Sequence, residues 1–358
     1  MHFEPLSSWL PAPSEPLIIS GPCGAESYEQ VMRTARGLKA LNRVALFRAG
    51  VWKPRTRPNA FEGKGEEALK WLQDVKKEYG FKLTVEVANA HHAELAIKYG
   101  VDVLWIGART TVNPFSVQEI AEVLKGVNVA VMVKNPIHAD LQLWIGGIER
   151  IYNSGIRKIA AIHRGFYFYG KTKYRNKPLW QLPIELRTQF PDLPLICDPS
   201  HIGGTRELLL PIAQKALDLG MNGLMIESHC EPEKALSDAQ QQVTPEQLGD
   251  LLSKLVLRKL NADNPNANTI LGELRRIIDE VDDELLNVLK KRTQIIEEIG
   301  KYKKEHHIIS FQLERWQEIL RTRGQWADKL GLSRQHVEKI CQLLHEESIR
   351  IQNGLMNE

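Results

Sequence analysis

The sequence has few cysteines, a small net charge and no apolar run long enough to span a membrane. The four cysteines show neither CxxC spacing nor a secreted disulfide framework, which favours a reducing cytoplasm. The first sixteen residues lack the basic start and apolar core of a secretory signal, which also favours a cytoplasmic location. A net charge of +3 over 358 residues gives no electrostatic case for nucleic acid or an anionic membrane as partner.

Short β-rich runs alternate with amphipathic helical patterns from residue 17 to about residue 260. The runs are almost continuously apolar, as expected for parallel strands buried on both faces. Eight such units favour an α/β TIM (β/α)8 barrel over an open, doubly wound sheet. The predicted strands lie within residues 17–24, 44–50, 82–88, 101–109, 128–135, 158–165, 193–201 and 223–229.

A polar, turn-rich segment, NADNPNAN at residues 261–268, follows the barrel pattern and predicts a linker. It divides the chain into a barrel domain, residues 1–260, and a small all-α domain, residues 269–358. Beyond it the β signal disappears and apolar residues recur at helical spacing. We predict helices within residues 269–307, 312–330 and 333–353.

The predicted strands end in polar residues that a core would not select. A solvated rim would account for any one of them, but the carboxyl ends of barrel strands converge on the face that carries active sites. One group is cationic and suits phosphates and a carboxylate: Arg48, Lys53, Arg55, Arg109, Lys134 and Arg164. The other offers mixed sulfur, nitrogen and oxygen donors for a divalent metal: Cys23, His201, Glu227 and Asp238.

These residues lie in motifs that resemble the short microbial type of 3-deoxy-D-arabino-heptulosonate 7-phosphate (DAHP) synthase. The motifs are GPC at 21, FRAGVWKPRT at 47, GAR at 107, VMVKN at 131, HRG at 163, DPSH at 198, MIESH at 225 and EPEKALSDAQQ at 231. The resemblance implies condensation of phosphoenolpyruvate with erythrose 4-phosphate. The alternative is the sister synthase that makes a 3-deoxy-octulosonate 8-phosphate, whose loop differs at KPRT.

The resemblance also implies a role for each matching residue. Arg109 and Arg164 would hold the phosphate of phosphoenolpyruvate, and Lys134 and Arg48 would lie near its carboxylate. Lys53 would be a candidate acid between the substrates, with a pKa that neighbouring cations lower. The aldose phosphate would bind Arg55 and Thr56. A divalent ion, Mn²⁺ or similar, would bind Cys23, His201, Glu227 and Asp238.

The first helical pattern of the tail carries three cations whose spacing is informative. Arg292 and Lys303 are eleven residues apart, which places them on one helix face about 17 Å apart. Arg275 lies about 25 Å from Arg292 along a straight helix and about a quarter-turn off that face. A solvated surface helix is the alternative to an anion site here.

The tail resembles the all-helical class of chorismate mutase through LRRIIDEVDDELLNVLKKR at 274, EIGKYK at 298 and HEESIRIQ at 345. The resemblance implies that chorismate is bound by Arg275, Arg292, Lys303, Arg315 and Gln352. The sequence departs from the family at Gln312 and Trp316, which stand where an Asp and a Glu are usual.

We therefore expect a bifunctional enzyme of aromatic biosynthesis that acts on small molecules and forms a homodimer or higher homo-oligomer. We further expect prephenate, the mutase product, to inhibit the barrel through the tail. The alternative for the tail is a non-catalytic regulatory or dimerisation module.

Overall fold

The computed structural model describes residues 1–10, 16–54, 60–259 and 265–357. The chain separates into two compact units, Met1–Leu260 and Asn261–Glu358. No helix among the described residues is both long enough and apolar enough to cross a membrane. Each unit is considered by itself below.

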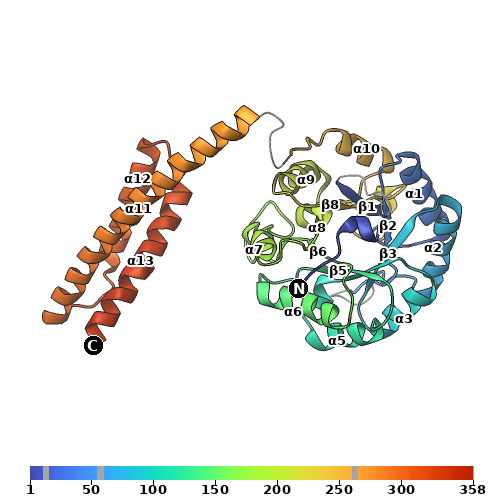
Figure 1. Cartoon of the computed structure of the whole chain (residues 1–358), viewed down its shortest axis with the longest axis horizontal. Coiled ribbons are helices and arrows are strands. Elements are labelled where there is room, and N and C mark those ends of the chain that lie inside the picture. Colours follow the sequence, from blue (N-terminus) through green and yellow to red (C-terminus); the bar gives the residue numbers. More distant parts are fainter. Residues whose placement is uncertain (11–15, 55–59, 260–264, 358) are drawn as a thin grey trace. The chain divides into compact units, whose positions relative to one another are not determined.

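Eight parallel strands form a closed barrel in sequence order, from β1 to β8 (Figure 1). The first strand closes the barrel on the last, with Leu17 opposite Gly223 and Gly21 opposite Glu227. The predicted TIM barrel is confirmed, and the open sheet is excluded. The strands are β1 Leu17–Gly21, β2 Leu46–Ala49, β3 Lys82–Val87, β4 Val103–Ile106, β5 Ala130–Lys134, β6 Ile159–His163, β7 Leu195–Cys197 and β8 Gly223–Glu227.

Helices form the outer layer of the barrel (Figure 1). Polar caps set several helix starts: Ser27 accepts a hydrogen bond from the backbone N–H of Gln30, and Thr244 forms a capping box with Gln247. The α-helices are α1 Tyr28–Ala40, α2 Glu66–Tyr79, α3 Ala90–Lys98, α4 Ala108–Thr111, α5 Pro114–Val123, α6 Leu141–Asn153, α7 Gln181–Gln189, α8 Pro199–Gly203, α9 Leu209–Asp218 and α10 Pro245–Ser253. Short 3₁₀ turns lie at Leu6–Ser8, Arg206–Leu208 and Pro232–Lys234.

Two apolar clusters stabilise the barrel. The larger one lies between the strands and the surrounding helices, and the smaller one fills the barrel interior. Trp9 and Leu10, which precede the first strand, belong to the interior cluster. Its strand residues recur at every second position, as required when alternate side chains point inward: Leu17, Ile19, Val103, Trp105, Ala130, Met132, Ala160 and Ile162.

The second unit is built from three helices, α11 Pro265–Glu305, α12 Leu313–Lys329 and α13 Arg334–Asn357. The helices α11 and α13 approach closely at Gly300, where an added Cβ would lie 3.1 Å from Cδ1 of Leu355 and 3.4 Å from the Cα of Gln352. The N-terminal end of α11 extends beyond the other two helices (Figure 1).

The helix α11 begins earlier than the sequence predicts. Residues 261–264 of the predicted linker lie outside the described residues, and residues 265–268 are already helical. Proline is favoured at the first position of a helix, where its missing N–H would have no partner. Pro265 therefore starts the helix instead of interrupting a loop.

Candidate active sites

Strand alternation places charged side chains inside the mouth of the barrel. Leu46 on β2, Met132 on β5 and Met225 on β8 belong to the interior cluster. Two residues further along the same strands come Arg48, Lys134 and Glu227, which therefore also point inward. All three are nearly inaccessible, with exposures of 1%, 4% and 0%. Groups this buried need charged or hydrogen-bonding partners.

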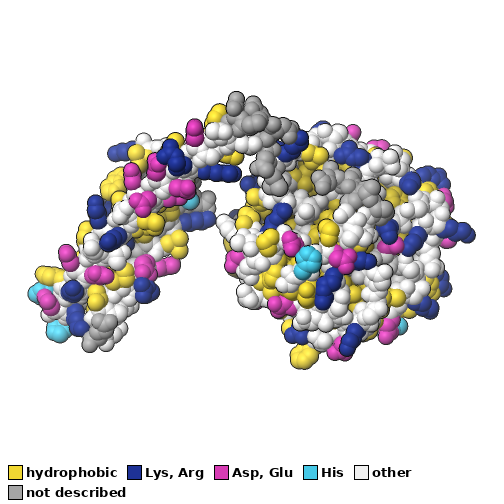
Figure 2. Space-filling view, in the orientation of Figure 1, with side chains coloured by type: hydrophobic (Ala, Val, Ile, Leu, Met, Phe, Trp, Pro, Cys, Tyr) yellow, Lys and Arg dark blue, Asp and Glu magenta, His cyan; other side chains and the backbone are white. Residues whose placement is uncertain are grey.

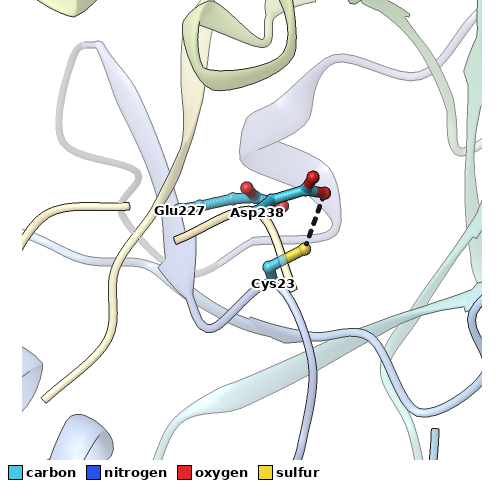
Figure 3. A group of neighbouring side chains, drawn as sticks. All are labelled: Cys23, Glu227 and Asp238. Carbon is cyan, nitrogen blue, oxygen red and sulfur yellow. Dashed lines mark hydrogen bonds between the residues drawn. The ribbon is translucent and has the colours of Figure 1, made fainter. Parts of the chain in front are cut away.

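A cluster of metal-ligand groups lies at the ends of β1 and β8 (Figure 3). Cys23 Sγ and one carboxylate oxygen each of Glu227 and Asp238 lie within 4.8 Å of one another. The thiol of Cys23 donates a hydrogen bond of 3.3 Å to Asp238 Oδ2. The carboxylate oxygen Glu227 Oε1 is buried and accepts no hydrogen bond from the described residues. A soft sulfur and two carboxylates, one of which has an oxygen without a hydrogen bond, fit a divalent cation.

His201, the fourth predicted ligand, lies beside this cluster but outside the 4.8 Å group. Its Nε2 is 3.8 Å from Glu227 Oε1, and its Nδ1 is 2.8 Å from Asp198 Oδ2. A carboxylate at Nδ1 favours the tautomer whose Nε2 lone pair is free to bind a metal. Burial lowers the pKa of His201; the charge of Asp198 opposes this effect, and Lys134 acts with burial, so the net shift is downward. The imidazole is therefore neutral, as a ligand must be.

The cluster has unusual protonation properties. Burial, followed by the charge of Glu227, raises the pKa of Cys23 to about 12. The pKa of Asp238 is lowered: burial alone would raise it, but Arg175, His201 and Lys53 together outweigh that effect. Without a bound cation, the site therefore holds a protonated thiol beside an ionised carboxylate.

Lys53 and Arg48 adjoin the cluster. The ammonium group of Lys53 donates hydrogen bonds to Cys23 Sγ at 2.9 Å and to the Cys23 carbonyl at 3.0 Å. Burial would lower the pKa of Lys53, yet Cys23 and Glu227 raise it above its ordinary value. The net shift is therefore upward, opposite to the predicted lowering, although Arg48 does act in the predicted direction. Arg48 lies 3.2 Å from Glu227 and keeps two buried N–H groups, at Nε and Nη1, without partners among the described residues.

A second set of cations lies around the ends of β5 and β6. Lys134 Nζ is 2.8 Å from Asp198 Oδ2, and Arg164 donates a hydrogen bond of 2.8 Å to Asn176 Oδ1. Burial lowers the pKa of Arg164 to about 10, and the positive charges of Arg175 and Arg109 act in the same direction. These cations repel one another, so an anion between them would be stabilised. Arg55 and Thr56, the predicted ligands of the aldose phosphate, lie outside the described residues.

Several residues that shape the site escaped the sequence prediction. Gln241 Nε2 donates a hydrogen bond of 2.6 Å to Glu227 Oε2, and Gln242 Oε1 accepts one of 2.9 Å from the backbone N–H of Cys23. Arg175 Nη1 donates to Asp238 Oδ1 at 2.9 Å and to Gln241 Oε1 at 2.7 Å. The two glutamines lie three and four positions after Asp238, at and just beyond the end of ALSDAQQ, and that proximity was the available signal. Arg175 lies far from them in sequence and left no such signal.

Cations also gather in the second unit. Lys303 on α11 is 8% exposed and donates a hydrogen bond of 2.8 Å to the Ser310 carbonyl. Burial lowers the pKa of both Lys303 and Arg292. Gln352 on α13 is 5% exposed, and its Oε1 has no partner among the described residues. Arg275 is exposed and lies nearer the start of α11, so the second unit alone does not bring it to Arg292, Lys303 and Gln352.

Arg315 differs from the other predicted chorismate ligands. Its side chain is 54% exposed and forms an ion pair with Glu318 on the same helix. Nothing in this unit by itself directs Arg315 toward Arg292 and Lys303.

A closed (β/α)8 barrel with buried cations and acidic groups at the carboxyl ends of its strands has the arrangement of a TIM-barrel enzyme. The family model described as "DAHP synthetase I family" matches residues 13–260, and the one described as "Chorismate mutase type II" matches residues 274–353. The chain therefore belongs to the DAHP synthetase I family, with a chorismate mutase type II domain in its second unit. Both domains are enzymes.

Relatives and solved structures agree with this assignment. The phospho-2-dehydro-3-deoxyheptonate aldolase of Thermotoga maritima is 33% identical over 238 residues, which cover 66% of this chain and 68% of the relative. The 2-dehydro-3-deoxyphosphooctonate aldolase of Wolinella succinogenes is 29% identical over 266 residues, covering 67% of this chain and 98% of the relative. A crystal structure of the Thermotoga maritima protein has a TM-score of 0.61 and 33% identity, covering 66% of this chain and 67% of that one. A truncated form of the Thermotoga maritima DAHP synthase has a TM-score of 0.58 and 30% identity, covering 66% and 84%.

Proposed function

We propose that the barrel condenses phosphoenolpyruvate with erythrose 4-phosphate to give DAHP and inorganic phosphate, in a reaction that depends on a divalent metal. The observation that carries this proposal is the pairing of the donor cluster, Cys23, Glu227 and Asp238, with buried cations at one barrel mouth. Both substrates carry phosphate and repel each other in water. A site that binds them together therefore needs the buried cations as well as the donor cluster.

The residues around the barrel mouth have different binding roles in this proposal. Arg48 offers its two unpartnered N–H groups to the carboxylate of phosphoenolpyruvate, with Lys134 beside it. Arg164 and Arg109 hold the phosphate group. Cys23, His201, Glu227 and Asp238 would hold the metal, Mn²⁺ or similar, which supplies a Lewis acid for the aldehyde oxygen.

The bond changes follow from the substrates. The enol carbon C3 of phosphoenolpyruvate attacks the aldehyde carbon, and the aldehyde oxygen gains a proton to become a hydroxyl. Water adds at the C2 cation, and loss of phosphate from C2 leaves the keto acid. Lys53 is the candidate donor of the proton, because its raised pKa keeps it protonated and its ammonium lies beside the cluster.

The second unit rearranges chorismate to prephenate in this proposal. The reaction is pericyclic and needs no nucleophile. Arg292 and Lys303 would bind negative charge, and Gln352 would approach the ether oxygen, where negative charge develops. The buried Lys303 and Gln352 support this role. A non-catalytic module remains the competing proposal because Trp316 replaces a carboxylate, and an assay on chorismate decides between them.

A homodimer follows from the apolar surface of the second unit. At 41 residues, α11 is about 60 Å long, more than either α12 with 17 residues or α13 with 24 residues can cover by itself. Yellow hydrophobic side chains are visible along this unit (Figure 2). Ten aliphatic residues of α11 are more than 40% exposed, namely Ile270, Leu271, Leu274, Ile277, Ile278, Val281, Leu285, Leu286, Val288 and Ile295. A second copy of the same helix would bury this surface, and Arg275 would then serve the partner's site.

Feedback inhibition of the barrel by prephenate is the regulatory part of the proposal. The barrel performs an early step of aromatic biosynthesis, and the fused domain forms a later product. An effector must bind one arrangement of the two domains better than another to slow the barrel.

Steady-state assays of the full chain test the synthase proposal. We expect phosphate release from phosphoenolpyruvate with erythrose 4-phosphate, its loss on addition of a chelator, and recovery with Mn²⁺. Relatives named 2-dehydro-3-deoxyphosphooctonate aldolase favour a second candidate, for which arabinose 5-phosphate would be the better substrate. A higher kcat/KM for arabinose 5-phosphate would overturn the first assignment. Full activity in metal-free enzyme would overturn the metal site.

A further inference from the structure

An imidazole lies flat on an indole ring where α13 packs against α12. The rings of His345 and Trp316 have centroids 4.2 Å apart and planes inclined by 12°. Phe311 approaches the same imidazole from its edge, at 5.8 Å and 60°. Two aromatic contacts therefore fix the orientation of the His345 ring, so that its nitrogen atoms point in defined directions.

The nitrogen Nε2 of His345 is buried and has no hydrogen-bond partner among the described residues. Gln352 Oε1 is also buried and also has no hydrogen-bond partner among the described residues. These two residues are seven positions apart on α13, which places them on one face of the helix, two turns from each other. A buried polar atom without a partner costs free energy, so a partner from outside the unit is expected for each.

The charges near His345 determine its protonation. Burial lowers the pKa of His345, and the positive charges of Arg292 and Lys303 on α11 lower it further, while Glu346 opposes them. The imidazole is therefore neutral at pH 7. A neutral imidazole both donates and accepts hydrogen bonds, which suits a hydroxyl group better than a carboxylate.

We propose that His345 contacts the substrate of the mutase site, and that its Nε2 hydrogen-bonds the hydroxyl group of chorismate while Trp316 holds the ring in place. This inference rests on the proposed mutase function. Chorismate carries two carboxylates, an ether oxygen and one hydroxyl. Arg292 and Lys303 suit the anionic groups, and the hydroxyl is the neutral group that matches a neutral imidazole. Gln352 lies two turns further along the same face.

The hydroxyl is retained in prephenate, which predicts where the effect of a mutation will appear. A contact made equally to substrate and product changes binding and leaves the barrier from the bound state nearly unchanged. We expect His345→Leu to raise the KM for chorismate and the Kd for prephenate by about 2- to 12-fold, the range of one net hydrogen bond. The kcat should stay within about twofold of the wild type.

Two matched variants in the full chain sharpen the test. His345→Gln places an amide nitrogen near the position of Nε2 and should recover most of the binding. His336→Leu changes an exposed histidine on the same helix and should leave the KM and the Kd unchanged. Circular dichroism and sedimentation on each variant establish that the helices and the oligomer are intact.

A ligand comparison in the wild-type chain tests the named contact directly. An analogue of chorismate with hydrogen in place of the hydroxyl should bind the wild type more weakly by the factor that His345→Leu costs. It should bind His345→Leu no more weakly than chorismate does. In wild-type protein, the ¹⁵N resonance of His345 Nε2, identified by its absence in His345→Gln, should shift on addition of prephenate.

The outcomes separate this inference from the proposal beneath it. If the wild type neither converts chorismate nor binds prephenate, the mutase function itself fails. If the wild type does both, two results would overturn the role of His345 alone. One is an equal affinity of the wild type for chorismate and for the analogue without the hydroxyl, and the other is an Nε2 resonance that does not shift. An unfolded His345→Leu variant leaves both of these measurements valid, because they use the wild-type chain.

Discussion

The side-chain amide of Gln241 donates a hydrogen bond of 2.6 Å to Oε2 of Glu227, inside the barrel mouth. Its carbonyl oxygen accepts a hydrogen bond of 2.7 Å from Arg175, which also binds Asp238. Gln241 is 1% exposed, so both bonds are shielded from water. This residue therefore connects two of the proposed metal ligands through hydrogen bonds, and it fixes the direction in which Glu227 presents its other oxygen, Oε1.

Replacing Gln241 should weaken metal binding more than it weakens the fold. Gln241→Met keeps the approximate volume but removes both hydrogen bonds, which leaves a carboxylate oxygen of Glu227 without its donor. Loss of a residue that orients a metal ligand typically costs about 10- to 100-fold in metal affinity. We expect that range for Mn²⁺ or Co²⁺ in calorimetric titration, with a loss of about 1–3 kcal/mol in the free energy of unfolding.

The neighbouring Gln240 provides the control for this prediction. It belongs to the same segment but is exposed, so Gln240→Met should leave metal affinity unchanged. Equal metal affinities for Gln241→Met and the wild type would show that Glu227 needs no support from this amide.

Cys23→Ser should separate metal affinity from stability. Serine is a harder and weaker ligand than thiolate, so the affinity should fall by at least the factor expected for Gln241→Met. The serine hydroxyl can keep the hydrogen bonds to Lys53 and Asp238, so the unfolding free energy should change by about 1 kcal/mol or less. Thermal unfolding and metal titration of the same sample measure both quantities. Cys341→Ser, in the second unit, should change neither metal affinity nor synthase activity.

The positions of the inward-facing charged residues could be predicted from the sequence because they follow a simple rule. In a parallel barrel, alternate residues point inward, and Arg48, Lys134 and Glu227 each lie two positions beyond an interior apolar residue. The strand pattern therefore predicted both the barrel and the face on which these side chains meet.

Other features of the site depend on contacts that no local pattern encodes. Arg175 reaches Asp238 across 63 positions of sequence, and Lys134 reaches Asp198 across 64. Such pairs are selected by the folded geometry, because each buried charge must find a partner. The direction of the pKa shift of Lys53 has the same origin: the sequence indicates that cations lie nearby but not that the effects of Cys23 and Glu227 exceed that of Arg48.

Removal of the second unit should abolish the response to prephenate. A chain truncated after residue 260 keeps the whole barrel and its helices, so we expect a synthase that is active but insensitive to prephenate. The full chain should lose activity as prephenate is added, and initial rates across a prephenate titration compare the two. A truncated barrel as sensitive as the full chain would place the inhibitor site in the barrel.

Mixed dimers test whether each mutase site draws on two chains. Arg275 and Arg292 are both on α11, and seventeen residues of helix separate them by about 25 Å. If Arg275 completes the partner's site, Arg275→Ala and Arg292→Ala homodimers are both inactive. A heterodimer of the two then has one intact site. We expect mixing after brief dissociation to recover up to about a quarter of wild-type mutase activity, since half of the dimers are mixed and each has one working site. No recovery, despite exchange of subunits shown by differently tagged chains, would contradict the composite site.

Acidification should destabilise the second unit through His345. Burial and the charges of Arg292 and Lys303 hold the pKa of this imidazole below its ordinary value in the fold. The unfolded chain, with a histidine pKa of about 6.5, therefore binds a proton more readily than the folded chain does. Stability is fully present above about pH 6.5, falls as the pH drops below that value, and levels off below the folded pKa.

The measurement is the unfolding temperature of the second unit between pH 7.5 and pH 5.5, in the full chain and in His345→Leu. The wild type should lose stability over this interval, and His345→Leu should lose less, because leucine has no proton to bind. His336→Leu, which alters an exposed histidine on the same helix, should follow the wild-type curve. Parallel curves for the wild type and His345→Leu would mean that His345 titrates alike in the folded and unfolded chains. In that case neither burial nor the cations of α11 would lower its pKa in the folded chain.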